Sequence, residues 1–201
     1  MKKFQRLPLE QRKEEIQNAA LTLFGEKGFS ATTMENIVSA VSLSKGGVYR
    51  IYPSTEEILK DLMLQGMHLR NAYYGRRIEA HLAEGKALSL HFLVEIIGDS
   101  LLLYQEVSRV YVEFLIEKRR NPALQKLYEE ICRQSEEDTL NLIRAWGAEA
   151  FLPGSPGMLQ QLTELMNSAV LALHVLNLEE QLKENREALI DMITNILTKD
   201  V

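Results

Sequence analysis

The sequence predicts an all-α protein with a small N-terminal head and a larger C-terminal helical body. Apolar side chains recur at spacings of three and four residues along nearly the whole chain, whereas the two-residue alternation of β-strands is almost absent. Hydrophobic residues make up 46% of the 201 positions, which is enough to bury a real core. The pattern therefore favours helices packed on helices.

The first two helices are expected before residue 42. An apolar stripe predicts a helix that stops at Gly28, where Phe29 folds back onto Phe24 in a Schellman-type ending. Thr32 and Glu35 then have the spacing of a capping box, so a second short helix is expected to begin there.

A third short helix and then a long one are expected next. Either serine of the stretch 42–44 is suited to cap a helix that runs through about Tyr52. Pro53 breaks the chain, and Ser54 with Glu57 forms another capping box that begins the long helix. Further amphipathic segments are predicted at 87–105, 107–119, 122–147, 157–180 and 184–198, with a linker at 152–157.

Charge and cysteine usage limit the classes of function. Cys132 is the only cysteine, so no intramolecular disulfide is possible and a reducing, cytoplasmic location is expected. The most apolar stretch, 101–104, is far shorter than the roughly 18 residues of a membrane span, so no membrane partner is expected. The net charge of −5 is unevenly spread: residues 1–60 hold nine Lys/Arg and seven Asp/Glu, and the remainder is acidic. This balance is compatible with DNA binding through the head alone.

Residues 42–59 read SLSKGGVYRIYPSTEEIL and contain two adjacent glycines in an expected helix. Two short helices joined by a tight turn and braced by a preceding helix form a helix-turn-helix, whose second helix enters the major groove. Gly46 and Gly47 would let that helix approach the duplex without a Cβ in the way. Lys45 adds a cation, and the hydroxyls of Tyr49 and Tyr52 are suited to reach phosphate oxygens. For Tyr49, partial burial in the head remains an open alternative.

The run from Arg12 to Leu59 resembles the DNA-binding domain of TetR-type (tetracycline-repressor-like) transcriptional regulators. The motifs AALTLFGEKGF, TTMENI and SKGGVY carry the likeness, together with the second aromatic residue three positions later. The resemblance implies a homodimer whose C-terminal body binds a small molecule and adjusts the spacing of the two heads. It further implies that Thr33 and Tyr49 contact phosphate, that Ser44 begins the recognition helix and that Arg50 reaches the backbone or base edges.

Three positions depart from the pattern of this family. Val41 and Ser42 replace an alanine-glycine pair, and Tyr52 replaces a phenylalanine. Thr55 stands where a lysine is expected to reach a phosphate, so this contact is weakened or absent.

The body offers candidates for an apolar ligand cavity, although ordinary core packing is an alternative for each of them. The side chains expected to line this cavity are His91, Phe92, Glu95, Tyr104, Tyr111, Phe114, Tyr128, Trp146 and His174. Glu95 and Asp99 share one helix face and are suited to a cationic ligand, or else form a solvated face. The spacing of the chain predicts neither a metal site nor a catalytic nucleophile, and no cofactor is expected.

The last two long helices carry apolar residues on more than one face, which indicates a four-helix interface between two copies of the chain. The residues expected in this interface are Leu162, Met166, Ala169, Leu173, Leu176, Ile190, Ile193 and Leu197. A deeply buried helix within a monomer is the competing interpretation.

The sequence therefore predicts a helix-turn-helix domain over residues 1–53 and a ligand-binding and dimerisation domain over residues 54–201. The expected function is a ligand-responsive repressor that binds a palindromic double-stranded DNA operator as a homodimer and is released by an unidentified small molecule. The alternative is a helical small-molecule binding protein or enzyme with a degenerate DNA-binding head.

Overall fold

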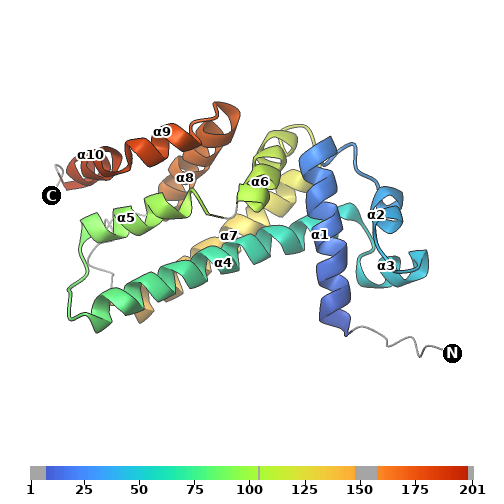
Figure 1. The fold of residues 1–201 in the computed structure, drawn as a ribbon, viewed down its shortest axis with the longest axis horizontal. Coiled ribbons are helices and arrows are strands. Elements are labelled where there is room, and N and C mark those ends of the chain that lie inside the picture. The colour runs from blue at the N-terminus through green and yellow to red at the C-terminus, as the bar shows by residue number, and fades with distance from the viewer. Residues whose placement is uncertain (1–7, 104, 148–157, 199–201) are drawn as a thin grey trace. The chain divides into compact units, whose positions relative to one another are not determined.

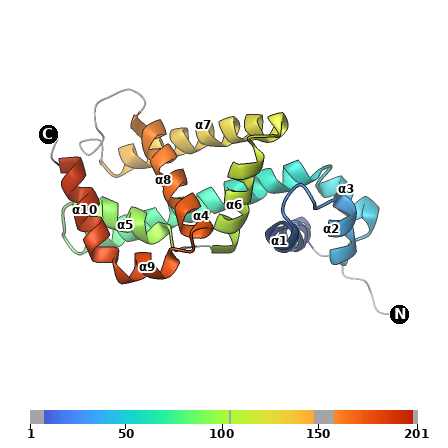
Figure 2. The same ribbon diagram turned by 90° about the horizontal axis from the view of Figure 1, so that it is seen from above.

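The computed structural model describes residues 8–103, 105–147 and 158–198 (Figures 1 and 2), and every regular element in these residues is a helix. The predicted all-α class is confirmed. The helices are α1 (Leu9–Lys27), α2 (Met34–Ala40), α3 (Lys45–Ile51), α4 (Thr55–Ala83), α5 (Leu90–Ser100), α6 (Gln105–Glu117), α7 (Pro122–Ala145), α8 (Met158–Val175), α9 (Glu179–Glu184) and α10 (Arg186–Thr198).

The C-terminal segments differ from the predicted ranges. The helix expected over 157–180 ends at Val175, and a separate short helix, α9, precedes α10. Asn177 has a φ of 53°, a left-handed conformation that an α-helix cannot continue through. The predicted linker at 152–157 lies outside the described residues.

The chain divides into two compact units. The first comprises the residues up to Gln65 together with Glu106–Glu129, and the second comprises Gly66–Gln105 and the residues from Glu130 onward. Helices α4 and α7 each contribute residues to both units. A domain boundary after residue 53 stays a prediction. Among the described helices, none is both long and apolar enough to span a bilayer.

The N-terminal part of the first unit has a core of fully buried apolar side chains. Ile16 and Phe24 of α1 are completely buried, as are Ile37 of α2 and Val48 of α3. Because each helix contributes to the same core, α2 and α3 are fixed against α1 by apolar burial.

The predicted stop of α1 is confirmed. Gly28 has a φ of 81° and its N–H donates to the carbonyl of Phe24 at 3.0 Å. Phe29 packs on Phe24 with ring centroids 5.2 Å apart. The ψ of Gly28 is 159°, so the chain leaves α1 in an extended conformation and not through the αL residue of a Schellman motif.

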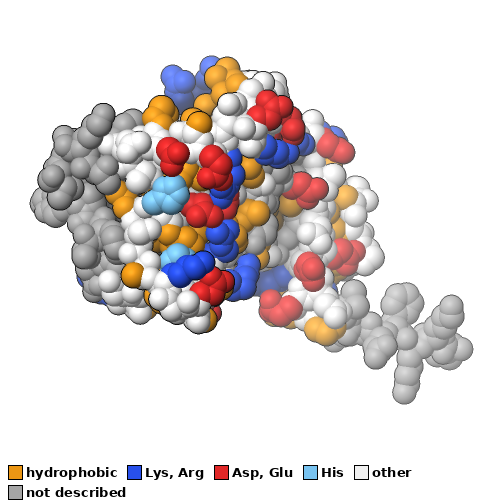
Figure 3. All heavy atoms as spheres, turned by 60° about the vertical axis from the view of Figure 1, so that its left-hand side comes forward, with side chains coloured by type: hydrophobic (Ala, Val, Ile, Leu, Met, Phe, Trp, Pro, Cys, Tyr) orange, Lys and Arg blue, Asp and Glu red, His pale blue; other side chains and the backbone are white. Residues whose placement is uncertain are grey.

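In the second unit, α10 packs along α5, and a cluster of charged side chains joins both helices to α4. Arg186 donates to Asp99 at 2.5 Å and to Glu95 at 3.2 Å. Arg77 donates to both carboxylates at 3.0 Å. On the face drawn in Figure 3, acidic and basic side chains are likewise interspersed, with histidines among them.

The charge cluster predicts a pH-dependent stability. Burial raises the pKa of Asp99, but the hydrogen bonds from Arg186 and Arg77 outweigh it and hold this pKa below the usual 3.8. A carboxyl whose pKa is lower in the folded state than in the unfolded state stabilises the fold at pH values above the unfolded-state pKa. This stabilisation is lost as the pH falls through the folded-state pKa. Asp99→Asn should therefore lower the free energy of unfolding at neutral pH by about 1–2 kcal/mol. In urea unfolding, the difference from the wild type should shrink below about pH 4.

The exposed Glu184 provides the matched control, because it lies on α9 and Glu184→Gln makes the same change of charge. This control should stay within about 0.5 kcal/mol of the wild type. A difference between Asp99→Asn and the wild type that persists unchanged at low pH would show that the ionised carboxylate is not the stabilising form.

Candidate nucleic-acid interface

Helices α2 and α3 are joined by a turn over residues 41–44 and lie beside α1 (Figure 1). These elements form the helix-turn-helix that the sequence predicts. The second of them, α3, has only seven residues. A helix this short is unstable alone, so its position depends on the packing of Val48 and on its end caps.

The capping box of α2 is formed by Thr33 and Asn36, so the predicted box of Thr32 and Glu35 is wrong by one residue. The Thr33 hydroxyl accepts from the Asn36 backbone N–H at 3.2 Å, while the side-chain Oδ1 of Asn36 accepts from the Thr33 backbone N–H at 3.0 Å. Thr32 is buried instead, and its hydroxyl donates to the carbonyl of Gly28 at 2.9 Å. Burial thus selects which threonine forms the cap.

The capping box of α2 already uses the donors of Thr33 that were expected to contact a phosphate. Its hydroxyl also donates to the Asn36 side chain at 3.1 Å, so both the hydroxyl proton and the backbone N–H are directed within the chain. A role for Thr33 in DNA binding stays a prediction, and it would require this cap to rearrange.

The two glycines of α3 have different reasons to be glycine. The Ser44 hydroxyl caps α3 by accepting from the Gly47 N–H at 3.2 Å. A Cβ on Gly47 would lie 3.3 Å from that hydroxyl and 3.6 Å from Leu43. A Cβ on Gly46 would meet nothing within 4 Å. Gly47 is therefore explained by the packing of the cap, whereas no contact within the described residues explains Gly46.

Lys45 and Tyr49 both reach the same carboxylate oxygen of Glu35. The Lys45 ammonium lies 3.2 Å from this oxygen, and the Tyr49 hydroxyl donates to it at 3.1 Å. The hydrogen bond from Lys45, followed by a backbone hydrogen bond and that of Tyr49, lowers the pKa of Glu35. Partial desolvation and the bond to Glu35 raise the pKa of the Tyr49 hydroxyl. Sequence reasoning missed Glu35 in this role, because no local spacing relates it to residues ten and fourteen positions later.

Tyr52 belongs to the interior of the head and not to its surface, so the predicted DNA contact is wrong. The residue is 3% exposed, and its hydroxyl accepts from Gln17 at 2.8 Å and donates to Asp61 at 2.7 Å. Burial, followed by the bond to Asp61, raises the pKa of Tyr52 far above its ordinary value. The hydroxyl thus links the end of α3 to α1 and α4.

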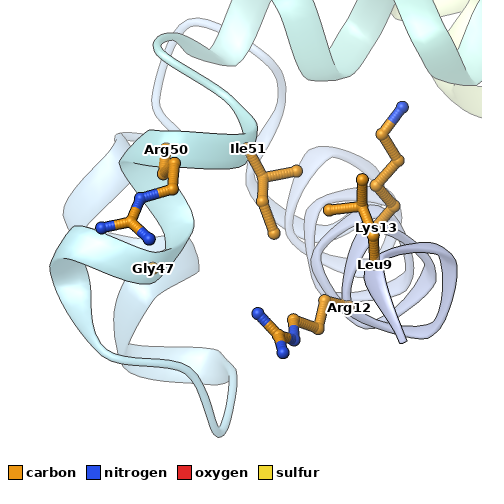
Figure 4. Close-up of a pocket in the computed structure, with 6 residues that line it drawn as sticks. All are labelled: Leu9, Arg12, Lys13, Gly47, Arg50 and Ile51. Atoms are coloured by element: carbon orange, nitrogen blue, oxygen red, sulfur yellow. The ribbon is translucent and has the colours of Figure 1, made fainter. Parts of the chain in front are cut away.

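A cleft of about 330 Å³ lies between the beginning of α1 and the end of α3 (Figure 4). The residues that line it are Leu9, Arg12, Lys13, Gly47, Arg50 and Ile51. Lys13 points away from both arginines and lies 3.9 Å from Asp61. Arg12 was not predicted as a site residue; a cation at the start of α1 has no local signature that places it beside α3.

Thr55 is the first residue of α4, and its hydroxyl donates to Glu56 at 3.4 Å. The Glu57 N–H donates to the Ser54 hydroxyl at 3.4 Å, which is the predicted helix-capping contact. A DNA contact for Thr55 stays a prediction.

The residues predicted to line a ligand cavity are divided between the two units. Tyr111, Phe114 and Tyr128 lie in the first unit, where Phe114 is fully buried and its ring centroid lies 6.2 Å from each tyrosine ring. The ammonium of Lys118 lies 3.3 Å from the centre of the Tyr128 ring. Tyr104 lies outside the described residues.

The remaining candidates lie in the second unit. Phe92 is buried and stacks on His81 at 3.8 Å, and Trp146 packs against the same apolar cluster. His91 lies 3.8 Å from Asp191. The side chain of His174 is 6% exposed and lies 3.2 Å from Glu179.

Glu95 is occupied by Arg77 and Arg186, so intramolecular cations already compensate its charge. A ligand role for all of these residues stays a prediction. Within the described residues, no three potential metal ligands gather into a cluster.

Burial separates the predicted interface residues into two groups. Leu173 and Ile190 are 5% and 3% exposed, so these two pack inside the chain and do not present a surface to a partner. Leu176 and Ile193 are exposed, whereas Met166 and Ala169 are half-buried. The side chains of Leu162 and Leu197 lie outside the described part of the chain.

Residues 16–62 match the family model of bacterial regulatory proteins of the tetR family. The chain is 41% identical over 58 residues to YfiR of Bacillus subtilis, an uncharacterized HTH-type transcriptional regulator. The matched segment covers 29% of this chain and 28% of YfiR. The chain is 40% identical over 48 residues to IcaR of Staphylococcus epidermidis, the HTH-type negative transcriptional regulator of the biofilm operon icaADBC. This match covers 24% of this chain and 26% of IcaR. The chain thus matches less than a third of the length of these relatives.

Two solved structures resemble nearly the whole chain. GusR of Salmonella enterica has a TM-score of 0.69 at 18% identity, with 98% of this chain and 97% of that chain covered. A protein from Syntrophomonas wolfei, assigned to the TetR family of transcriptional regulators, has a TM-score of 0.72 at 16% identity, with 94% of each chain covered. At these identities the likeness shows the fold.

Tyr49 and Tyr52 provide a contrast that tests the assignment of their hydroxyls. Tyr52→Phe removes the hydrogen bonds of the buried hydroxyl with Gln17 and Asp61, so it should lower the free energy of unfolding by about 1–2 kcal/mol. Tyr49→Phe removes an exposed hydroxyl and should change the stability by less than about 0.5 kcal/mol. Chemical unfolding of both variants measures the difference. Equal stabilities would mean that the buried hydroxyl does not hold the three helices together.

Proposed function

We propose that this chain is a transcriptional regulator of the TetR family, whose family model matches residues 16–62, and that it binds a palindromic DNA operator as a homodimer. In this proposal it acts as a repressor and a small molecule releases it from the operator. IcaR, which is similar over the head, is described as a negative regulator and supports the proposed sign of the effect.

The observation that carries the proposal is the exposed side of α3. Gly46 leaves backbone uncovered, and Lys45, Tyr49 and Arg50 surround it with a cation, a hydroxyl and a guanidinium. Ammonium and hydroxyl groups position a protein on phosphates, and a guanidinium is also suited to the O6 and N7 atoms of guanine. Because glycine has no Cβ, the backbone at this position is able to come close to the duplex.

The cleft beside α3 adds to this surface. Arg12 from α1 and Arg50 from α3 form parts of its lining, and no carboxylate of the described residues pairs with either guanidinium. Two such cations are available to phosphates on the same side of the duplex as α3. The weakly basic head and the acidic body agree with contact through the head alone.

Apolar side chains exposed in the second unit support the proposed homodimer. The large exposed ones in and next to α8 and α10 are Leu165, Val175, Leu176, Met192 and Ile193. A two-fold axis would bury the same surface of both copies against each other. The two α3 helices would then reach successive major grooves, about 34 Å apart. A small molecule that favours another separation would lower operator affinity by population shift.

The experiment that tests the function is selection of bound duplexes from a pool of random sequence, followed by measurement with Gly46→Ala. The wild type should enrich a palindrome. Gly46→Ala should stabilise the free protein by about 0.5–1 kcal/mol, because alanine favours a helix over glycine and the added methyl meets nothing. It should nevertheless weaken binding to the selected duplex at least about tenfold, because it prevents one close contact of the backbone with a phosphate.

Gly25→Ala is the matched control, since Gly25 lies within α1 and a Cβ there also meets nothing within 4 Å. It should leave the affinity for DNA unchanged. If Gly46→Ala binds the selected duplex as tightly as the wild type, the start of α3 does not approach DNA.

The homodimer is tested by Leu176→Glu. Leu176 is 63% exposed, so a glutamate is tolerated in the monomer, whereas burial of its charge at an interface is costly. Sedimentation should show dissociation at concentrations where the wild type is dimeric. Leu82→Glu on α4, where the leucine is 44% exposed, makes the same change elsewhere and should remain dimeric. A stable Leu176→Glu dimer would place the interface at another surface.

A further inference from the structure

We propose that Glu35 competes with DNA phosphate for Lys45 and Tyr49, and so limits the affinity of the head for any duplex. The inference rests on the proposed DNA-binding function and adds a residue that attenuates it. Glu35 lies in the first turn of α2, whereas its two partners belong to α3.

The contact lies on the surface, where a phosphate is able to replace it. One oxygen of Glu35 lies 3.2 Å from the Lys45 ammonium and 3.1 Å from the Tyr49 hydroxyl. The side chains of Lys45 and Glu35 are 66% and 64% exposed. The ammonium also lies 5.6 Å from the centre of the Tyr49 ring, so the three side chains form one compact group.

The position of Glu35 is not explained by the cap of α2. Asn36 supplies that cap, so the capping box does not require the Glu35 side chain. Its carboxylate is instead directed at α3. A carboxylate and a phosphate present the same kind of negatively charged oxygen acceptor to these donors.

The competition follows from the number of donors. A tyrosine hydroxyl has one proton, so Tyr49 donates either to Glu35 or to a phosphate, never to both. Lys45 has three N–H donors and is able to bridge, but its charge is then shared between two anions. When phosphate takes the place of the carboxylate, Glu35 remains beside it as a second negative charge. Binding must therefore overcome both the lost contact and the repulsion.

This effect is independent of DNA sequence, because phosphates have the same chemistry at every step of the duplex. Glu35 should thus lower the affinity for operator and for unrelated DNA alike. The consequence for the regulator is a smaller fraction held on non-operator DNA at a given salt concentration.

Glu35→Gln tests the inference, because glutamine keeps the size and an oxygen acceptor but removes the charge. Two probes are needed: the duplex selected by the wild type and a duplex of the same length and unrelated sequence. At low salt the variant dimer should bind both about two- to tenfold more tightly. A plot of log K against log salt should become steeper by about 0.9 per head, since one opposing charge is removed.

Two further variants separate this contact from a general effect of charge. Glu26→Gln removes an exposed carboxylate near the end of α1 and should change affinity less than Glu35→Gln. In a Lys45→Met background, the gain from Glu35→Gln should shrink, because the contact between Lys45 and Glu35 is then absent and only that of Tyr49 remains. Equal gains for Glu26→Gln and Glu35→Gln, or a gain independent of Lys45, would overturn the inference.

The remaining outcomes separate this inference from the function on which it rests. Unchanged or weaker binding of both duplexes by Glu35→Gln, with a wild type that binds its operator, would overturn the inference alone. Weaker binding of the operator only would mean that Glu35 accepts a hydrogen bond from a base, as a carboxylate does from the amino group of cytosine. If neither protein binds any duplex, both the proposed function and the inference fail. NMR titration of Glu35 would still check the contact itself, since Lys45→Met should return its lowered pKa toward the ordinary range.

Discussion

The orientation of α3 depends on the Tyr52 hydroxyl, which accepts a hydrogen bond from Gln17 of α1 and donates one to Asp61 of α4. A seven-residue helix has little stability of its own, so the elements around it must determine its direction. Val48 secures the middle of α3 through burial, and Ser44 secures its beginning through the cap. With the end fixed by Tyr52, the exposed side of the helix is held in a single position.

This frame gives two similar residues opposite roles. Tyr49 and Tyr52 are three positions apart, but Tyr49 lies within α3 and Tyr52 directly follows it. The chain becomes extended at Tyr52, with φ −130° and ψ 112°, and the ring turns into the core. Tyr49 stays near the surface, where its hydroxyl meets Glu35. One tyrosine thus determines the position of the helix, and the other is available to a partner.

Local patterns predicted the features that depend on local physics. The apolar periodicity gave the all-α class, and the glycine after α1 marked its end because a positive φ at Gly28 suits a residue without a Cβ. The choice between Thr32 and Thr33 as the cap was not predictable in this way. Both have capping chemistry, and Thr32 is excluded only because the fold buries it.

The errors at the candidate sites have the same physical origin. An amphipathic pattern shows that Leu173 and Ile190 must be covered, but it does not say whether the cover is the same chain or a second copy. A carboxylate such as Glu35 looks like an ordinary solvated residue until the fold brings α2 and α3 together. Contacts between residues far apart in sequence depend on tertiary packing, which the spacing of residues in one sequence does not predict.

The rigid frame also restricts how a signal is able to reach DNA in the proposed regulator. Changing the shape of α3 would require breaking the core around Val48, the cap at Ser44 and the hydrogen bonds of Tyr52 together. Helix α4, by contrast, runs without interruption from the first unit into the second. A ligand in the body is therefore expected to act by moving each head as a whole through α4, leaving the exposed donors of α3 in their arrangement. The affinity of one head for one half-site would then be set by residues such as Glu35, while the ligand would govern whether both heads bind at once.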